Sequence, residues 1–136
     1  VDILFANEEE ARLLSSEFNL VRAGRQLQSS GPEVIIVKKG EHGAMVFGRN
    51  FVFSVVANPC ENVVDPTGAG DAFAGAFLGY LASRGEFNRR EIKKAAVYGN
   101  LVASLAIEDF GLDGLLRASQ LDLIQRYKNF KKIISF

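Results

Sequence analysis

The sequence predicts an α/β fold in which helices pack against a largely parallel sheet. Short apolar runs rich in β-branched residues alternate along the chain with longer segments of helical periodicity, which is the order typical of this class. Hydrophobic residues make up 48% of the 136 residues, enough to build a buried core. No repeat and no linker-like stretch divides the sequence, so we expect one domain.

The first third of the chain is expected to form a strand, two helices and a second strand. Residues 3–5 are a short apolar run, and Asn7 is a good N-cap for a helix that begins with three glutamates. A second helix is predicted over residues 20–28, where a Ser-Ser-Gly-Pro sequence ends it. Residues 34–38 are apolar and largely β-branched, and they give the strongest strand signal in the sequence.

A turn and a hairpin are predicted next. Residues 39–43 contain two glycines and turn the chain, and residues 44–47 and 51–56 are expected to pair around a Gly-Arg-Asn turn. Residues 63–65 are expected to form a short edge strand that leads into a glycine-rich loop.

The second half is predicted to be mainly helical. A helix over residues 71–82 repeats large apolar side chains at every fourth position. Gly75 and Gly79 would each destabilise an exposed helix by about 1 kcal/mol, so we expect them to pack closely against another element. Residues 89–107 are expected to form a further helix with a narrow face of small side chains, and residues 120–129 a last one.

Composition excludes several classes of protein. Sixteen basic and sixteen acidic side chains give no net charge, so the basic excess of a nucleic-acid-binding protein is absent. One cysteine, Cys60, and one histidine, His42, can form neither a disulfide framework nor a common zinc site, and both are expected to be inert. No run approaches the roughly 20 apolar residues that span a bilayer. We therefore expect a cytoplasmic protein without a membrane or nucleic-acid partner.

The beginning of the sequence suggests a larger polypeptide. Met45 is the only methionine, and the first residues have the pattern of a strand already under way. No signal peptide opens the chain. We expect the 136 residues to be part of a longer protein.

The loop at residues 65–71, Asp-Pro-Thr-Gly-Ala-Gly-Asp, lies between a predicted strand and a predicted helix. Gly68 and Gly70 allow backbone conformations that point successive N–H groups into one concavity, where phosphate binds well. Asp71 would repel a phosphate, but it suits a base that takes a proton from an attacking hydroxyl. The alternative is a plain glycine turn with Asp71 as the helix N-cap, and the spacing alone leaves both open.

Residues 65–73, Asp-Pro-Thr-Gly-Ala-Gly-Asp-Ala-Phe, resemble the C-terminal signature of the ribokinase-like, or PfkB-type, carbohydrate and nucleoside kinases. Two upstream segments resemble family motifs in the same order: Asn-Glu-Glu-Glu from residue 7 resembles N-x-x-E, and Lys-Lys-Gly-Glu-His-Gly from residue 38 resembles the G-x-x-G nucleotide turn. The resemblance implies that residues 1–136 are the C-terminal nucleotide-binding and catalytic portion of such a kinase, and that its N-terminal substrate and lid half is absent. It implies a ribokinase-like three-layer α/β/α fold, here partial.

The resemblance implies catalytic roles for four residues of the signature loop. Asp71 is implied as the general base that deprotonates the acceptor hydroxyl. Gly68, Ala69 and Gly70 are implied as the anion hole for the transferred phosphoryl group.

The resemblance also implies residues for the cofactors, ATP, Mg²⁺ and a monovalent cation. Asn7 and Glu10 are implied to organise Mg²⁺ and the phosphates, Glu10 through water. Asp65 and Thr67 match positions that help bind a monovalent cation in some members, although residues 108–112 depart from the ribokinase-type cation loop. The implied nucleotide contacts are Asn7, Lys38, Gly40, Gly43 and Asn100.

The function implied by the resemblance is ATP-dependent phosphoryl transfer to a hydroxyl of a sugar or nucleoside. The chain alone is expected to be inactive, because the acceptor pocket belongs to the absent half. The alternatives are a non-catalytic nucleotide- or anion-binding module and one half of a split kinase, and the expected protein partners are a second copy or the missing N-terminal half. For Asn7 and Glu10, the alternative is a capped helix with a solvated acidic first turn.

Overall fold

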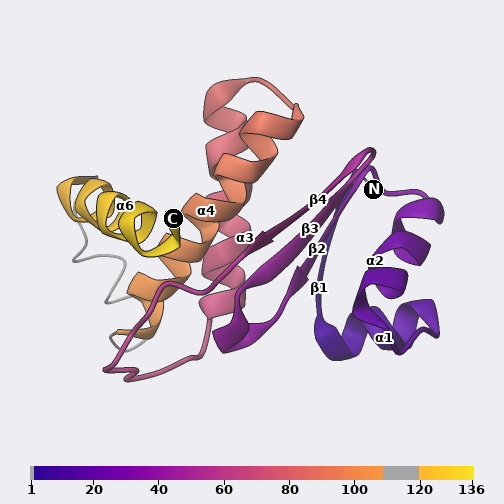
Figure 1. Ribbon diagram of the computed structural model, residues 1–136, viewed down its shortest axis with the longest axis horizontal. Coiled ribbons are helices and arrows are strands. Elements are labelled where there is room, and N and C mark those ends of the chain that lie inside the picture. Colours follow the sequence, from indigo (N-terminus) through magenta and orange to yellow (C-terminus); the bar gives the residue numbers. More distant parts are fainter. Residues whose placement is uncertain (1, 109–119) are drawn as a thin grey trace. The chain divides into compact units, whose positions relative to one another are not determined.

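The computed structural model describes residues 2–108 and 120–136, which fall into two compact units, Val1–Val56 and Ala57–Phe136. In chain order the elements are β1 (Ile3–Asn7), α1 (Glu8–Ser15), α2 (Leu20–Ser29), β2 (Val34–Lys38), the 3-10 turn η1 (Gly40–His42), β3 (Ala44–Gly48), β4 (Phe51–Val55), α3 (Ala69–Arg84), α4 (Arg89–Ile107) and α6 (Gln120–Ile134) (Figure 1).

The four strands of the first unit form one sheet in the order β1-β2-β3-β4. β1 and β2 run parallel, whereas β2 with β3 and β3 with β4 are antiparallel. The prediction of a largely parallel sheet is therefore wrong. A parallel pair needs a crossover of a dozen or more residues, and in this sheet the β1–β2 connection, which contains α1 and α2, is the one of that length.

α1 and α2 lie on the same side of this sheet (Figure 1). Apolar residues from both helices and from three strands form one buried cluster: Ala6, Ala11, Leu27, Ile35, Val37 and Phe47. Gly24 of α2 faces the ring of Phe47, and a Cβ at this position would overlap that ring. The helix approaches the sheet closely because a glycine lies at the contact.

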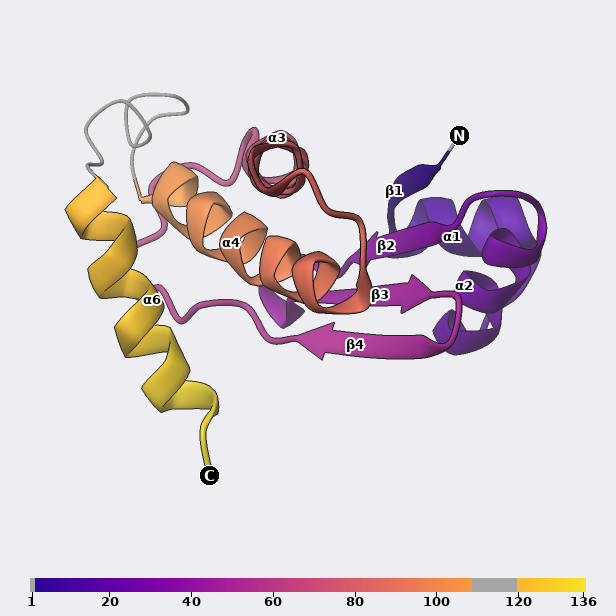
Figure 2. The same cartoon turned by 90° about the horizontal axis from the view of Figure 1, so that it is seen from above.

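In the second unit, α3 and α4 pack against each other (Figure 2). Phe73, Phe77 and Leu81 of α3 are buried, as their spacing predicts. At Gly99 of α4 the contact is tight, because a Cβ there would lie 3.0 Å from the carbonyl oxygen of Phe73. Gly99, on the small-residue face of α4, thus lies at the contact with α3.

The three tyrosines of the chain connect the helices of the second unit. Tyr98 of α4 stacks on Tyr80 of α3 with ring centroids 4.9 Å apart, and on Tyr127 of α6 at 5.5 Å. Phe130 of α6 is buried. α6 therefore packs on α4 through the stacking of Tyr127 on Tyr98.

Two expectations about the second unit are wrong. Gly75 and Gly79 do not pack closely against another element: both are exposed, and a Cβ at either would meet no described atom within 4 Å. Residues 63–65 form no strand, because the N–H groups of Val64 and Asp65 both donate to the carbonyl oxygen of Ile107, at 2.8 and 3.2 Å. This segment is held by the end of α4 and not by a sheet.

Two helices differ from their expected bounds by more than one residue. α3 begins at Ala69, two residues before the predicted start, because Gly68 adopts the N-cap position. α6 ends at Ile134, five residues beyond the predicted end.

Candidate functional site

The first group of predicted site residues lies at the carboxyl ends of β1 and β2. These strands are parallel, and Asn7 at the end of β1 is in register with Lys38 at the end of β2. Ligands of α/β proteins bind at the carboxyl ends of parallel strands. Two residues predicted to contact the nucleotide are therefore neighbours at this edge of the first unit.

Asn7 and Glu10 form a reciprocal capping box at the start of α1. The Glu10 N–H donates to Asn7 Oδ1 and the Asn7 N–H donates to Glu10 Oε2, both at 2.8 Å. The structure thus contains the capped helix that the sequence left as the alternative. The capping box uses one of the two Glu10 carboxylate oxygens, so capping is compatible with a role at a hydrated metal ion.

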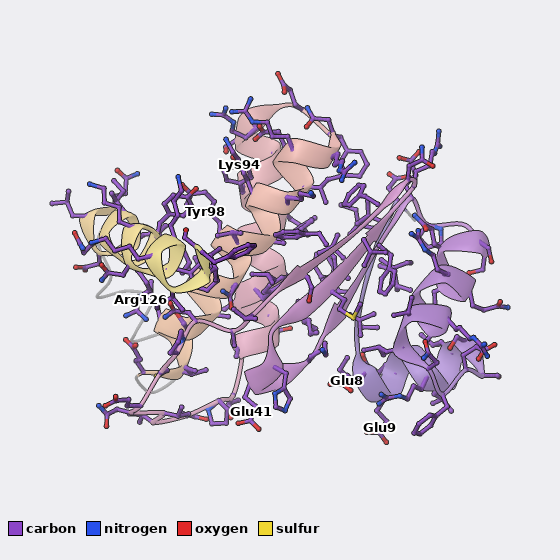
Figure 3. The ribbon with its side chains drawn as sticks, in the orientation of Figure 1. Glu8, Glu9, Glu41, Lys94, Tyr98 and Arg126 are labelled. Carbon is purple, nitrogen blue, oxygen red and sulfur yellow. The ribbon has the colours of Figure 1, made fainter. Side chains whose placement is uncertain are left out.

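The turn after β2 requires glycine at its two predicted nucleotide contacts. Gly40 has φ 56° and Gly43 has φ 91°, both in the region that disfavours side chains. The Lys39 N–H donates to the Gly43 carbonyl oxygen at 2.7 Å and closes the turn. Figure 3 shows Glu41 of this turn at the same end of the first unit as Glu8 and Glu9 of α1.

The second group of site residues begins with the signature loop. The Thr67 N–H donates to Asp65 Oδ1 at 2.9 Å, which closes an Asx turn ahead of the glycines. Hydrogen bonds from the side chain and the backbone of Thr67 lower the pKa of Asp65, so this residue is a carboxylate at neutral pH. Both residues predicted at the monovalent cation therefore stabilise the loop itself.

α3 begins at this loop without a side-chain cap. Gly68 occupies the N-cap position with φ 82°, and among the described residues it provides no side-chain cap for the first N–H groups. The Ala69 N–H donates to the Pro66 carbonyl oxygen at 3.3 Å. α1, α2 and α4 are each capped by an asparagine, namely Asn7, Asn19 and Asn88. Asp71 is exposed in the first turn of α3 and is not its N-cap. The first turn of α3 thus combines uncapped N–H groups with a carboxylate.

Asn100, predicted on the adenine side of the nucleotide, lies on α4 and is only 7% exposed. Its Oδ1 accepts the backbone N–H of Asn58 at 3.2 Å. Its Nδ2 is buried and has no hydrogen-bond partner among the described residues. A buried amide with unused donors is costly, so this atom has the capacity to bind an acceptor that the described residues do not supply.

Four residues around Asn100 were not singled out from the sequence: Asn58, Ser104, Glu108 and Arg126. Ser104 Oγ accepts from Asn58 Nδ2 at 3.4 Å and from Arg126 Nη1 at 3.1 Å. Arg126 also binds both oxygens of Glu108, at 2.8 and 2.7 Å. Asn100, Ser104 and the C-cap Glu108 follow one another at every fourth position along α4. This row of polar side chains in a helix of small apolar residues was the sequence signal that could have identified them.

The predicted site residues are divided between the two units. The group in the first unit is Asn7, Glu10, Lys38, Gly40 and Gly43, and the group in the second unit is Asp65, Thr67, Gly68, Ala69, Gly70, Asp71 and Asn100. Of the departing cation loop at 108–112, residues 109–112 lie outside the described residues.

Cys60 and His42 lie outside the predicted site residues. Burial and the neighbouring Glu108 raise the pKa of the Cys60 thiol, which disfavours the reactive thiolate. His42 is exposed, and its Nε2 lies 3.6 Å from Glu41 Oε1.

The described residues contain no group of three or more His, Cys, Asp or Glu side chains that could hold a metal ion. Mg²⁺ does not need such a group, because it keeps several waters and binds one or two carboxylates together with substrate phosphates. Asn7 and Glu10 fit this mode of binding. None of the helices in the described ranges is both long and apolar enough to cross a membrane.

Comparison with known proteins gives consistent results. The pattern of the pfkB family of carbohydrate kinases matches residues 1–118. A cytidine kinase of Thermococcus kodakarensis is 41% identical over 86 residues, which are 62% of this chain and 31% of that protein. A nucleoside kinase of Methanothermobacter thermautotrophicus is 32% identical over 110 residues, 81% of this chain and 33% of that protein. The chain therefore spans about a third of the length of these relatives.

Solved structures confirm the fold class. A fructokinase from Vibrio cholerae O395, with fructose, ADP and calcium bound, matches 93% of this chain and 41% of its own with a TM-score of 0.83 and 26% identity. A ribokinase from Thermotoga maritima matches 95% of this chain and 43% of its own with a TM-score of 0.78 and 25% identity. The prediction of a partial ribokinase-like α/β fold is confirmed.

Proposed function

The chain belongs to the pfkB family of carbohydrate kinases, and we propose that it carries the nucleotide site, the anion hole and the catalytic base for phosphoryl transfer from ATP to a hydroxyl of a sugar or nucleoside. The observation that carries the proposal is the start of α3. Gly68 replaces a capping side chain there, and Asp71 follows in the same turn. A helix used only for structure gains from an N-cap such as those of α1, α2 and α4.

Asp71 is the proposed general base. The acceptor oxygen forms a bond to the γ-phosphorus while the bond from that phosphorus to the β,γ-bridging oxygen breaks, and ADP leaves with that electron pair. The proton of the acceptor hydroxyl passes to the Asp71 carboxylate. General-base catalysis of this kind contributes about 10²–10⁴-fold to a rate.

The N–H groups of Gly68, Ala69 and Gly70 are the proposed donors to the transferred phosphoryl group. Phosphoryl transfer depends on positioning and on charge stabilisation more than on covalent catalysis. Backbone donors at a helix N-terminus supply both, since they are fixed in place and lie at the positive end of the dipole. Glycines at positions 68 and 70 leave room for the phosphate oxygens.

The proposed nucleotide contacts are those that the family resemblance implies. Lys38, Gly40 and Gly43 contribute the turn after β2, and Asn100 contributes an amide whose donors find no partner among the described residues. Asn7 and Glu10 are proposed to hold Mg²⁺ through water, and Mg²⁺ when bound neutralises phosphate charge. Asp65 and Thr67 are proposed at a monovalent cation.

The acceptor pocket is proposed to lie in a further part of the full-length polypeptide. Relatives are about three times as long as the matched segment. The proposed location of the enzyme is the cytoplasm, because its proposed reaction uses ATP. The length difference also favours a second candidate, a nucleotide-binding module or one half of a split kinase, in which turnover requires a partner chain.

Acceptor-dependent ADP release by the full-length polypeptide tests the proposal. Cytidine is the first acceptor to assay, because the 41% identical relative is named a cytidine kinase; adenosine, ribose and fructose complete the panel. Release with at least one of them supports the kinase. Tight Mg-ADP binding without release for any acceptor would favour the module.

A further inference from the structure

The 57–65 segment comprises residues 57–65 and lies along α4. It contacts Asn100 and Ser104 of α4 and the C-cap residue Glu108. Asn58 donates to Asn100 Oδ1 at 3.2 Å and to Ser104 Oγ at 3.4 Å. Cys60 Sγ lies 3.8 Å from Glu108 Oε1. The segment therefore follows the polar row of α4 from one turn to the next.

The same segment ends at the signature loop. The N–H groups of Val64 and Asp65 both donate to the carbonyl oxygen of Ile107, at 2.8 and 3.2 Å. Asp65 in turn accepts the N–H of Thr67, one residue before the N-cap of α3. The geometry of the loop thus depends on the position of the last turn of α4.

Arg126 of α6 touches the α4 side chains that hold this segment. Its guanidinium donates to Ser104 Oγ at 3.1 Å and binds Glu108 Oε1 and Oε2 at 2.8 and 2.7 Å (Figure 3 labels Arg126). The Arg126 side chain is 20% exposed and that of Glu108 is 36% exposed. A two-point guanidinium–carboxylate pair is stronger and more directional than an ordinary ion pair.

Arg126 donates one of the hydrogen bonds that Ser104 accepts. The Ser104 hydroxyl donates to the Leu101 carbonyl oxygen at 2.6 Å, and its two lone pairs receive Asn58 and Arg126. Glu108 is the C-cap of α4 and follows Ile107 directly. Without Arg126, Ser104 loses one donor and the charged C-cap loses its counterion.

We propose that Arg126 is a positioning residue for phosphoryl transfer: by binding Ser104 and Glu108, it fixes the last turn of α4, and so holds the 57–65 segment, the signature loop and the Asn100 amide in place. The inference rests on the proposed function, because the loop and the amide are the proposed ligand contacts. Arg126 itself touches neither ATP nor the acceptor in this assignment.

Amide hydrogen exchange of the full chain measures the positioning without any ligand. In Arg126→Ala, the amides of Val64 and Asp65 are expected to exchange about tenfold faster, the size of one lost hydrogen bond to a charged group. The amides of β2 and of the middle of α3 are expected to keep their rates. A variant that merely loosened the fold would speed exchange at all of these amides together, and that pattern would overturn the proposal.

A matched control separates positioning from the docking of α6. Tyr127→Leu removes the ring that stacks on Tyr98 at 5.5 Å but leaves Arg126. It is expected to lower stability while the Val64 and Asp65 amides keep their exchange rates relative to the rest of the chain. If Arg126→Ala does not fold, Arg126→Lys and Glu108→Gln give smaller effects in the same direction. Because the two residues act through one contact, the double variant is expected to add little to either single one.

Binding of Mg-ADP, followed by calorimetry, connects the positioning to function. Wild type is expected to bind, Arg126→Ala about tenfold more weakly, and Tyr127→Leu like wild type. Equal binding by wild type and Arg126→Ala would overturn the positioning role and leave the kinase assignment intact. A wild-type full-length polypeptide that binds no Mg-ADP would instead contradict the proposed function.

Discussion

The hydroxyl of Tyr80 donates a 2.9 Å hydrogen bond to the carboxylate of Glu91, a charged residue that is only 3% exposed. Arg84 Nε lies 3.3 Å from the same carboxylate oxygen. Tyr80 and Arg84 belong to α3, and Glu91 lies in the first turn of α4. The contact therefore joins two helices of the second unit through a buried charge that has both a hydrogen-bond donor and a cation.

This contact is expected to make stability depend on pH in the acidic range. The hydrogen bond from Tyr80 lowers the pKa of Glu91, so the folded state binds this proton more weakly than the unfolded state does. The resulting stability is present above the unfolded-state pKa, about 4.3, and is lost as the pH falls through the lowered folded-state pKa. Tyr80→Phe should lower the urea midpoint at pH 7, and the difference from wild type should shrink on acidification. A difference that does not change with pH would contradict this assignment.

The alkaline range gives a second test of the same pair. Burial, followed by the hydrogen bond to Glu91, raises the pKa of Tyr80 to about 12. The folded state therefore holds this proton more tightly, and its contribution to stability is lost as the pH rises from about 10 towards 12. A spectrophotometric titration of wild type should contain a tyrosine step near pH 12 that Tyr80→Phe lacks. If the step remains in the variant, it belongs to another tyrosine.

Two glycine-to-alanine substitutions should change stability in opposite directions. At Gly99 a Cβ would lie 3.0 Å from the Phe73 carbonyl oxygen, so Gly99→Ala should destabilise the protein by roughly 1–3 kcal/mol. At Gly79 no described atom lies within 4 Å of a Cβ, so Gly79→Ala should stabilise it by about 0.4–1 kcal/mol. Chemical denaturation measures both values. Equal signs for the two variants would contradict the packing of α3 on α4.

The sequence predicted the order of the helices and of the four strands of the first unit, because local periodicity carries that information. It predicted the pairing of β3 with β4, but not the antiparallel pairing of β2 with β3. It also did not predict that residues 63–65 bind the Ile107 carbonyl oxygen, since that contact depends on a partner distant in the sequence. For the same reason Gly99 and Gly79 look alike in the sequence and differ in the structure. The signature loop could be proposed from the sequence because its residues are consecutive, whereas the contacts of Arg126 join α6 to α4 and its C-cap.

Asn7 and Asn19 allow the capping role to be separated from the proposed metal role. Each caps a helix of the first unit, with the side chain accepting from first-turn N–H groups. Asn7→Ala and Asn19→Ala should each cost about 0.5–2 kcal/mol of stability. Only Asn7→Ala should also weaken Mg-ADP binding, measured by calorimetry. Equal Mg-ADP binding by the two variants would mean that Asn7 caps α1 and has no role at the metal ion.

The anion hole can be tested with sulfate as the probe. In an NMR titration, the amides of Gly68, Ala69 and Gly70 should shift, because backbone N–H groups at a helix start bind oxyanions. Gly70→Val should abolish these shifts by blocking the approach of the anion. Gly75→Val is the matched control, since Gly75 lies on the same helix with no described atom within 4 Å of a Cβ. Shifts confined to amides far from the loop would contradict the anion hole.

The most direct test of the central claim is the turnover of Asp71→Asn in the full-length polypeptide, measured with an acceptor that wild type phosphorylates. Asparagine keeps the size of the side chain and removes its ability to take a proton. If Asp71 is the catalytic base, kcat is expected to fall by about 10²–10⁴-fold, while the Kd for Mg-ATP stays close to the wild-type value. Turnover close to wild type would contradict the assignment of Asp71 as the catalytic base.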